Sequence, residues 1–139
     1  MPHTFRIAQA ARLRQRPLSV CVLRVRQSDS VVASRTGGWL DRALPQIGAM
    51  VSRLVRVEDT AARLAPEVFA LTLPATRAGE ARLAAERIAA VIGCTAFDAG
   101  PDRSPFVAEF DVGAAEMRPD ESAAALLERA SADLFEKTR

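Results

Sequence analysis

The hydrophobic pattern alternates between short extended runs and segments with helical spacing. Leu18-Ser-Val-Cys-Val-Leu-Arg-Val-Arg26 is rich in β-branched residues and opens as a nearly continuous apolar run, which predicts a central strand. Two short strands are predicted at residues 62–64 and 68–73, separated by the turn of a hairpin. Residues 106–114 predict a further strand after a turn-rich loop.

Apolar residues recur at helical spacing in four segments. They predict helices over residues 5–13, 40–55, 77–92 and 121–137, the last with Asp120 available as its cap. Because Ala-rich helices alternate with short strands and hairpins, the chain is predicted to be an α/β or α+β domain built on one sheet.

The length and composition fit a single soluble domain. The chain has 139 residues and 49% hydrophobic content, enough for one core. No apolar run approaches the roughly 20 residues that cross a bilayer, and the N-terminus lacks the apolar block of a signal peptide. We therefore expect a cytoplasmic protein without membrane insertion.

Charge and cysteine content exclude some functions. Lys and Arg outnumber Asp and Glu by 19 to 17, and a net charge of +2 is too small to favour nucleic-acid binding. Cys21 and Cys94 have no metal-type spacing, so both are interpreted as reduced packing residues.

Four segments, taken in order, carry a family resemblance. They are Arg16-Pro-Leu-Ser-Val-Cys-Val-Leu23, Arg63-Leu-Ala-Pro-Glu-Val-Phe69, residues 71–91 with a Leu-Pro strand end and an Ala-Glu-Arg-Ile helix, and residues 126–137. Together they resemble the GGDEF domain of bacterial diguanylate cyclases. The resemblance implies one domain over residues 1–139, with a central, mostly antiparallel sheet of about five strands flanked by helices. It leaves open that this domain is the C-terminal part of a larger multidomain protein.

The chain departs from the family pattern at the positions that bind metal and nucleotide in the family's active site. A diguanylate cyclase must hold divalent metal ions against a GTP triphosphate, and such hard cations need carboxylate ligands. Here both acidic positions of the first strand are arginines, the two signature glycines are replaced, and one of the two signature acids is lost. These degenerate active-site positions are Arg24, Arg26, Ala65, Pro66, Glu67 and Val68.

Other family positions have changed as well. Val32 stands where the resemblance implies a guanine-binding Asn, while Asp41 keeps its acidic partner, and Ser131, Phe135 and Thr138 replace polar residues of the closing helix. The resemblance therefore implies a domain without cyclase activity, cofactor or metal. We also expect Arg24 to pair with Glu67 and so fill the vacant metal position, because a partly buried carboxylate needs a cation.

The family's inhibitory site, by contrast, is retained in register. Arg56-Val-Glu-Asp59 matches its Arg-x-x-Asp, and Arg87 matches its second guanine-reading arginine. A guanidinium can donate two hydrogen bonds to guanine O6 and N7, and a carboxylate can accept from N1 and N2. Because Arg-x-x-Asp also occurs at Arg26-Gln-Ser-Asp29, an exposed ion pair is the alternative interpretation.

Two functions remain open at this point. The first is a catalytically inactive receptor for cyclic di-GMP, which binds at Arg56, Asp59 and Arg87 and switches a contact with a protein partner or a second copy. The second is a ligand-free structural interaction or dimerisation domain. A residual cyclase or GTP-binding domain is favoured only by Glu67 and Asp41.

Overall fold

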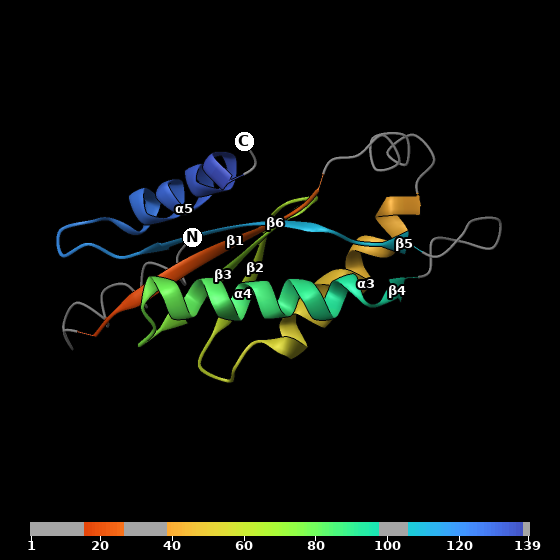
Figure 1. The fold of residues 1–139 in the computed structure, drawn as a ribbon, viewed down its shortest axis with the longest axis horizontal. Coiled ribbons are helices and arrows are strands. Elements are labelled where there is room, and N and C mark those ends of the chain that lie inside the picture. The colour runs from red at the N-terminus through yellow and green to blue at the C-terminus, as the bar shows by residue number, and fades with distance from the viewer. Residues whose placement is uncertain (1–15, 27–38, 98–105, 138–139) are drawn as a thin grey trace.

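The computed structural model describes residues 16–26, 39–97 and 106–137. Four antiparallel strands form the main sheet in the order β2-β3-β1-β6 (Figure 1). They are β1 (Leu18–Val25), β2 (Thr60–Ala65), β3 (Val68–Pro74) and β6 (Phe110–Glu116). Two further strands, β4 (Ala96–Phe97) and β5 (Phe106–Val107), pair as a separate two-stranded sheet. The helices are α3 (Trp39–Leu54), α4 (Ala78–Gly93) and α5 (Ala123–Lys137).

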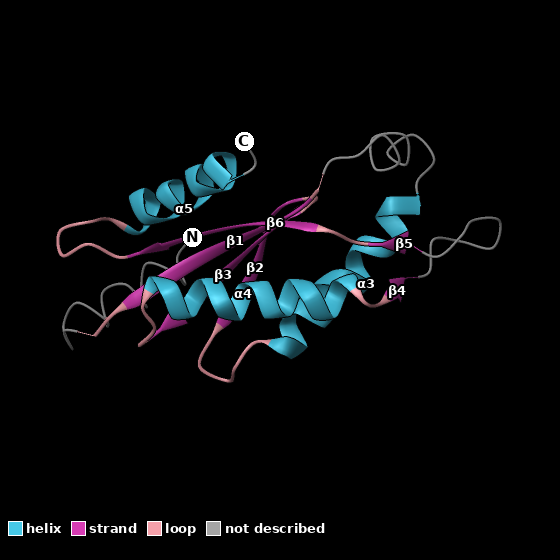
Figure 2. Cartoon of the chain, in the orientation of Figure 1, coloured by secondary structure: helices cyan, strands magenta, loops and turns pink. Residues whose placement is uncertain are grey.

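The helices cover both faces of the sheet, so the domain has three layers. Figures 1 and 2 show α5 on one side of the strands and α3 with α4 on the other. This confirms the predicted fold class, a mixed α/β domain on an antiparallel sheet flanked by helices. None of the helices within the described ranges is long and apolar enough to cross a membrane.

The alternation of side chains along β1 explains the two cores. Cys21, Leu23 and Val25 face α3 and α4, whereas Val20 and Val22 face α5. Because both faces are covered, the strand is apolar almost throughout, as its sequence predicts. β1 is therefore a central strand of the sheet, paired with β3 on one side and β6 on the other.

Side chains from α4 and α5 meet around the outer edge of β6. Arg82 on α4 forms an ion pair with Asp133 on α5, and Asp133 also accepts a hydrogen bond from the Ala114 amide at 3.0 Å. At Gly113, an added Cβ would clash with the Ala130 carbonyl oxygen. Glycine is therefore what lets α5 lie directly on β6.

Several local predictions need correction. The strand predicted at 106–114 is split into β5 and β6, and the helix cap is Ser122, whose Oγ accepts from the Ala125 amide at 3.1 Å, rather than Asp120. Cys21 is buried as predicted, and burial raises its pKa to about 12. Cys94 is exposed, so its interpretation as a packing residue is wrong. The helix predicted at residues 5–13 lies outside the described residues.

Candidate functional site

The turn between α3 and β2 brings Arg56 and Asp59 into direct contact. Nε and Nη2 of Arg56 donate to the two carboxylate oxygens of Asp59, each at 2.9 Å. The Asp59 carboxylate also accepts from the Arg56 amide at 3.1 Å, and the Asp59 amide donates to the Arg56 carbonyl at 3.0 Å. The Arg-x-x-Asp spacing thus closes into one tight turn, held by both backbone and side-chain bonds.

The two side chains of this turn differ in exposure. The Asp59 side chain is 2% exposed and that of Arg56 is 50% exposed. Side-chain hydrogen bonding to Asp59, in which Arg56 is the donor, is the main reason that the pKa of Arg56 is raised, and burial opposes it. The buried Asp59 carboxylate therefore holds the guanidinium of a side chain that is half exposed to solvent.

The start of α4 supplies further contacts to Arg56. Thr76, just before the helix, accepts a hydrogen bond from Nη2 of Arg56 at 2.7 Å. Glu58 lies 3.3 Å from Nε, and the negative charge of Glu80 in the first turn of α4 also raises the Arg56 pKa. These contacts place the turn beside the N-terminal end of α4.

Arg87 lies on the exposed side of α4. It follows Glu80 by seven residues, which places the two on the same helix face, about 10 Å apart along the axis. Of the three predicted ligand residues, the structure joins Arg56 to Asp59 and carries Arg87 on the helix that begins beside them. No hydrogen bond or ion pair within the described residues connects Arg87 to that pair.

The described positions of the predicted degenerate active site also gather, at the opposite end of β1. Arg24 and Val68 are cross-strand partners, and the Val25 amide donates to the Glu67 carbonyl at 2.8 Å. In the hairpin between β2 and β3, Nε and Nη2 of Arg63 donate to the Pro66 carbonyl at 3.2 and 3.0 Å. The arginine thereby braces the turn that replaces the family's two glycines.

Arg24 has a carboxylate partner that the sequence did not predict, whereas its ion pair with Glu67 stays a prediction. Arg24 donates to Asp111 on β6 at 2.9 Å, and Asp111 is its direct cross-strand partner. Arg26 binds the other Asp111 oxygen at 3.2 Å and Glu109 at 3.0 Å. A carboxylate from β6 therefore neutralises the charge of Arg24.

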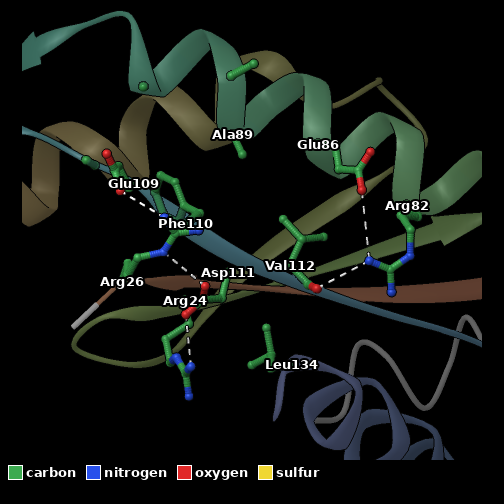
Figure 3. A pocket seen from close by; sticks show the side chains of 13 residues that line it. Arg24, Arg26, Arg82, Glu86, Ala89, Glu109, Phe110, Asp111, Val112 and Leu134 are labelled. Atoms are coloured by element: carbon green, nitrogen blue, oxygen red, sulfur yellow. Dashed lines mark hydrogen bonds and ion pairs between the residues drawn. The ribbon is translucent and has the colours of Figure 1, made fainter. Parts of the chain in front are cut away.

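These charges border a cavity of about 850 Å³ along β6. Figure 3 shows Arg24, Arg26 and Asp111 on one side, with Arg82 and Glu86 projecting from α4 on the other. Sequence reasoning missed Asp111 and Arg82, because each gains its role from contacts with distant segments. Val32 and the side chains of Asp41, Phe135 and Thr138 lie outside the described part of the structure, whereas Ser131 is half-buried on α5.

Comparisons with known proteins agree with this architecture. Residues 5–139 match the family model described as "Diguanylate cyclase, GGDEF domain". The chain therefore belongs to the GGDEF family. A comparison with curated protein sequences gives no match.

Solved GGDEF domains share the fold at low sequence identity. The domain of DgcB from Caulobacter crescentus, in complex with c-di-GMP, has a TM-score of 0.85 and 21% identity over 99% of this chain and 81% of that chain. The FimX GGDEF domain from Pseudomonas aeruginosa has a TM-score of 0.82 and 17% identity over 97% and 83%. SiaD from the same organism, a diguanylate cyclase in complex with its activator SiaC, has a TM-score of 0.86 and 23% identity over 99% and 52%.

Proposed function

We propose that this GGDEF domain is a non-catalytic receptor for cyclic di-GMP. Arg56 is the primary guanine-binding residue and Arg87 the second. The proposal is carried by the half-exposed side chain of Arg56, whose guanidinium is held in a fixed orientation by a buried carboxylate. Pre-orientation lowers the entropy lost on binding, so a held arginine binds a planar base better than a free one.

Asp59 acts in this proposal through Arg56. Its carboxylate is bound by Arg56 on both oxygens and is almost fully buried. Guanine N1 and N2 would reach it only after this pair opens, so we assign Asp59 to positioning the arginine rather than to reading the base. Arg87, exposed on α4, is available for the second guanine or a phosphate, which arginine binds through charge-assisted bonds.

The residues at the end of the sheet far from Arg56 support the proposal that the domain has no cyclase activity. A metal ion there would meet the guanidinium groups of Arg24 and Arg26, which bind the Asp111 carboxylate at 2.9 and 3.2 Å. Divalent ions need several oxygen ligands, and nearby guanidinium groups would repel them. The described residues at this end of the sheet therefore do not fit the metal that the family's reaction uses.

The hairpin adds a steric argument. Ala65 and Pro66 replace the glycines that would let the backbone run close beside a nucleotide, and Pro66 has no amide N–H to offer a phosphate. The Arg63 side chain is bound to the turn carbonyl. We therefore infer that this end of the domain has no catalytic role, and that its output is a ligand-dependent contact with a protein partner or a second copy in the bacterial cytoplasm.

A ligand-free structural domain is the second candidate. It is favoured by the same ion pair, because Arg56 and Asp59 satisfy each other and Glu58 adds a second carboxylate at 3.3 Å. An internally neutralised pair needs no ligand to explain it. The two candidate functions differ in whether the Arg56 guanidinium ever exchanges a protein partner for a ligand.

Calorimetric titration separates these candidates. Cyclic di-GMP should bind the receptor with a Kd near the micromolar level, about 8 kcal/mol of binding free energy, and GTP serves as the control nucleotide. Binding of cyclic di-GMP without comparable binding of GTP supports the receptor. The absence of heat at hundreds of micromolar cyclic di-GMP would leave the structural domain as the function.

A further inference from the structure

The turn that connects β3 to α4 is strained and tightly bonded. Ala75 has a φ of 51°, in the left-handed region that residues with a Cβ rarely adopt. Thr76 follows it and is 4% exposed. The Thr76 hydroxyl donates to the Pro74 carbonyl at 2.8 Å, and the Thr76 carbonyl accepts from the buried Ser19 hydroxyl at 2.7 Å. The Thr76 side chain is therefore fixed in place by the sheet.

The Thr76 hydroxyl also accepts a hydrogen bond from one of the N–H groups of Arg56. A guanidinium has five N–H groups along two edges, and bidentate recognition of a base uses two parallel N–H groups of one edge. The edge formed by Nε and Nη2 is bound by Asp59. On the other edge, Nη2 donates to the Thr76 hydroxyl at 2.7 Å. A base that binds the Nη1 and Nη2 edge must therefore displace Thr76.

Releasing the two edges of the Arg56 guanidinium from their protein partners would cost different amounts of free energy. Freeing the Asp59 edge breaks two charge-assisted bonds and leaves a carboxylate that is 2% exposed without its cation. Freeing the Thr76 edge breaks one bond to a neutral hydroxyl, which keeps its bond to the Pro74 carbonyl. The Thr76 bond is thus the one that gives way to a ligand.

We propose that Thr76 is a further residue of the ligand site, and that its hydroxyl competes with guanine for Arg56 and holds the ligand-free site closed. This inference rests on the proposed receptor function. Because Thr76 directly precedes the N-cap residue of α4, ligand capture of Arg56 also breaks the bond that joins the Arg-x-x-Asp turn to the start of the helix carrying Arg87.

Titration of cyclic di-GMP into Thr76→Val tests the competition. Valine keeps the shape and removes the hydroxyl, so the Kd should fall by about three- to tenfold, the change expected when one competing hydrogen bond is lost. Thr76→Ser, which retains the hydroxyl, should return the affinity to the wild-type value. In an Arg56→Ala background, Thr76→Val should have no effect on the remaining affinity, because the competition acts through Arg56.

The outcomes separate this inference from the function on which it rests. Wild-type binding with an unchanged or weaker Thr76→Val, folded as judged by its thermal unfolding, overturns the role of Thr76 and leaves the receptor intact. No binding by either protein overturns both, whereas binding by Thr76→Val alone supports the competition. Thr76→Ala carries the same expectation if the valine variant does not fold.

Discussion

Arg24 on β1 and Asp111 on β6 are cross-strand partners whose charged groups meet at 2.9 Å. The Asp111 side chain is 6% exposed, so its carboxylate depends on this contact for its charge balance. The pair occupies the end of β1 where the family pattern has an acidic residue. Arg24 therefore neutralises a nearly buried carboxylate of this domain.

Removing the charge of Arg24 should destabilise the domain. Arg24→Met retains most of the apolar stem but leaves Asp111 with Arg26 alone at 3.2 Å, so we expect a loss of about 1–3 kcal/mol of unfolding free energy. Arg26→Met is the matched control. Its side chain is about half exposed, and its removal should cost less than about 1 kcal/mol. Equal effects in urea denaturation would contradict this assignment.

The spacing of apolar residues was enough to predict the main strands and the central helix of this structure. The apolar run of β1, the hairpin of β2 and β3, and the helix near residues 78–93 each carry their signal within a few neighbours. Two-residue strands have no periodicity to detect, which explains why β4 was missed and why β5 was not separated from β6.

The contacts at the candidate sites depend on register between distant segments. Arg56 and Asp59 were predicted from their register in the family pattern, where the two residues lie three positions apart. The partner of Arg24 lies 87 residues away on β6, and the bond from Arg56 to Thr76 spans 20 residues. Neither separation has a sequence signature, so Asp111 and Thr76 emerged only from the structure.

Two glycines provide a matched test of how α5 packs. Gly113→Ala places a Cβ against the Ala130 carbonyl and 3.0 Å from the Leu134 amide nitrogen, so α5 must shift and the domain should lose about 2–4 kcal/mol. Gly79→Ala, in the first turn of α4, meets nothing within 4 Å and should stabilise by about 0.5–1 kcal/mol. Thermal and urea unfolding of both variants measure these changes, and a neutral Gly113→Ala would contradict the close packing.

The link between Glu121 and Arg129 should make stability depend on acid pH. Hydrogen bonding from Arg129 is the main cause that lowers the pKa of Glu121 below its ordinary value of 4.5. Because the folded pKa lies below the unfolded one, the contribution is present above pH 4.5 and is lost as the pH falls through the folded pKa. Glu121→Gln should therefore flatten the decline of unfolding free energy below that pH. An identical decline in both proteins would disprove this linkage.

The domain should show no diguanylate cyclase activity. With arginines at positions 24 and 26 and no signature glycines, GTP and Mg²⁺ or Mn²⁺ should give no cyclic di-GMP above a blank without protein. Arg24→Asp alone should not restore turnover, because Arg26, Pro66 and Val68 remain. Accumulation of product by the wild-type protein is the result that would sink this prediction.

Binding of cyclic di-GMP at Arg56 can be tested by one titration series. Truncating a bidentate arginine removes about 1–3 kcal/mol of base recognition, so Arg56→Ala should weaken binding roughly tenfold to a hundredfold. Asp59→Ala should weaken it strongly as well, since the arginine loses its anchor, and Arg87→Ala should also weaken it. Arg26→Ala, from the second Arg-x-x-Asp copy, is the control.

Calorimetry on the wild-type protein and these variants, each with its folding confirmed by thermal unfolding, gives the comparison. We expect micromolar binding by the wild-type protein and by Arg26→Ala, about 8 kcal/mol, with marked loss in Arg56→Ala. Equal affinity in Arg56→Ala and wild type, or no binding by the wild-type protein at hundreds of micromolar ligand, would contradict it.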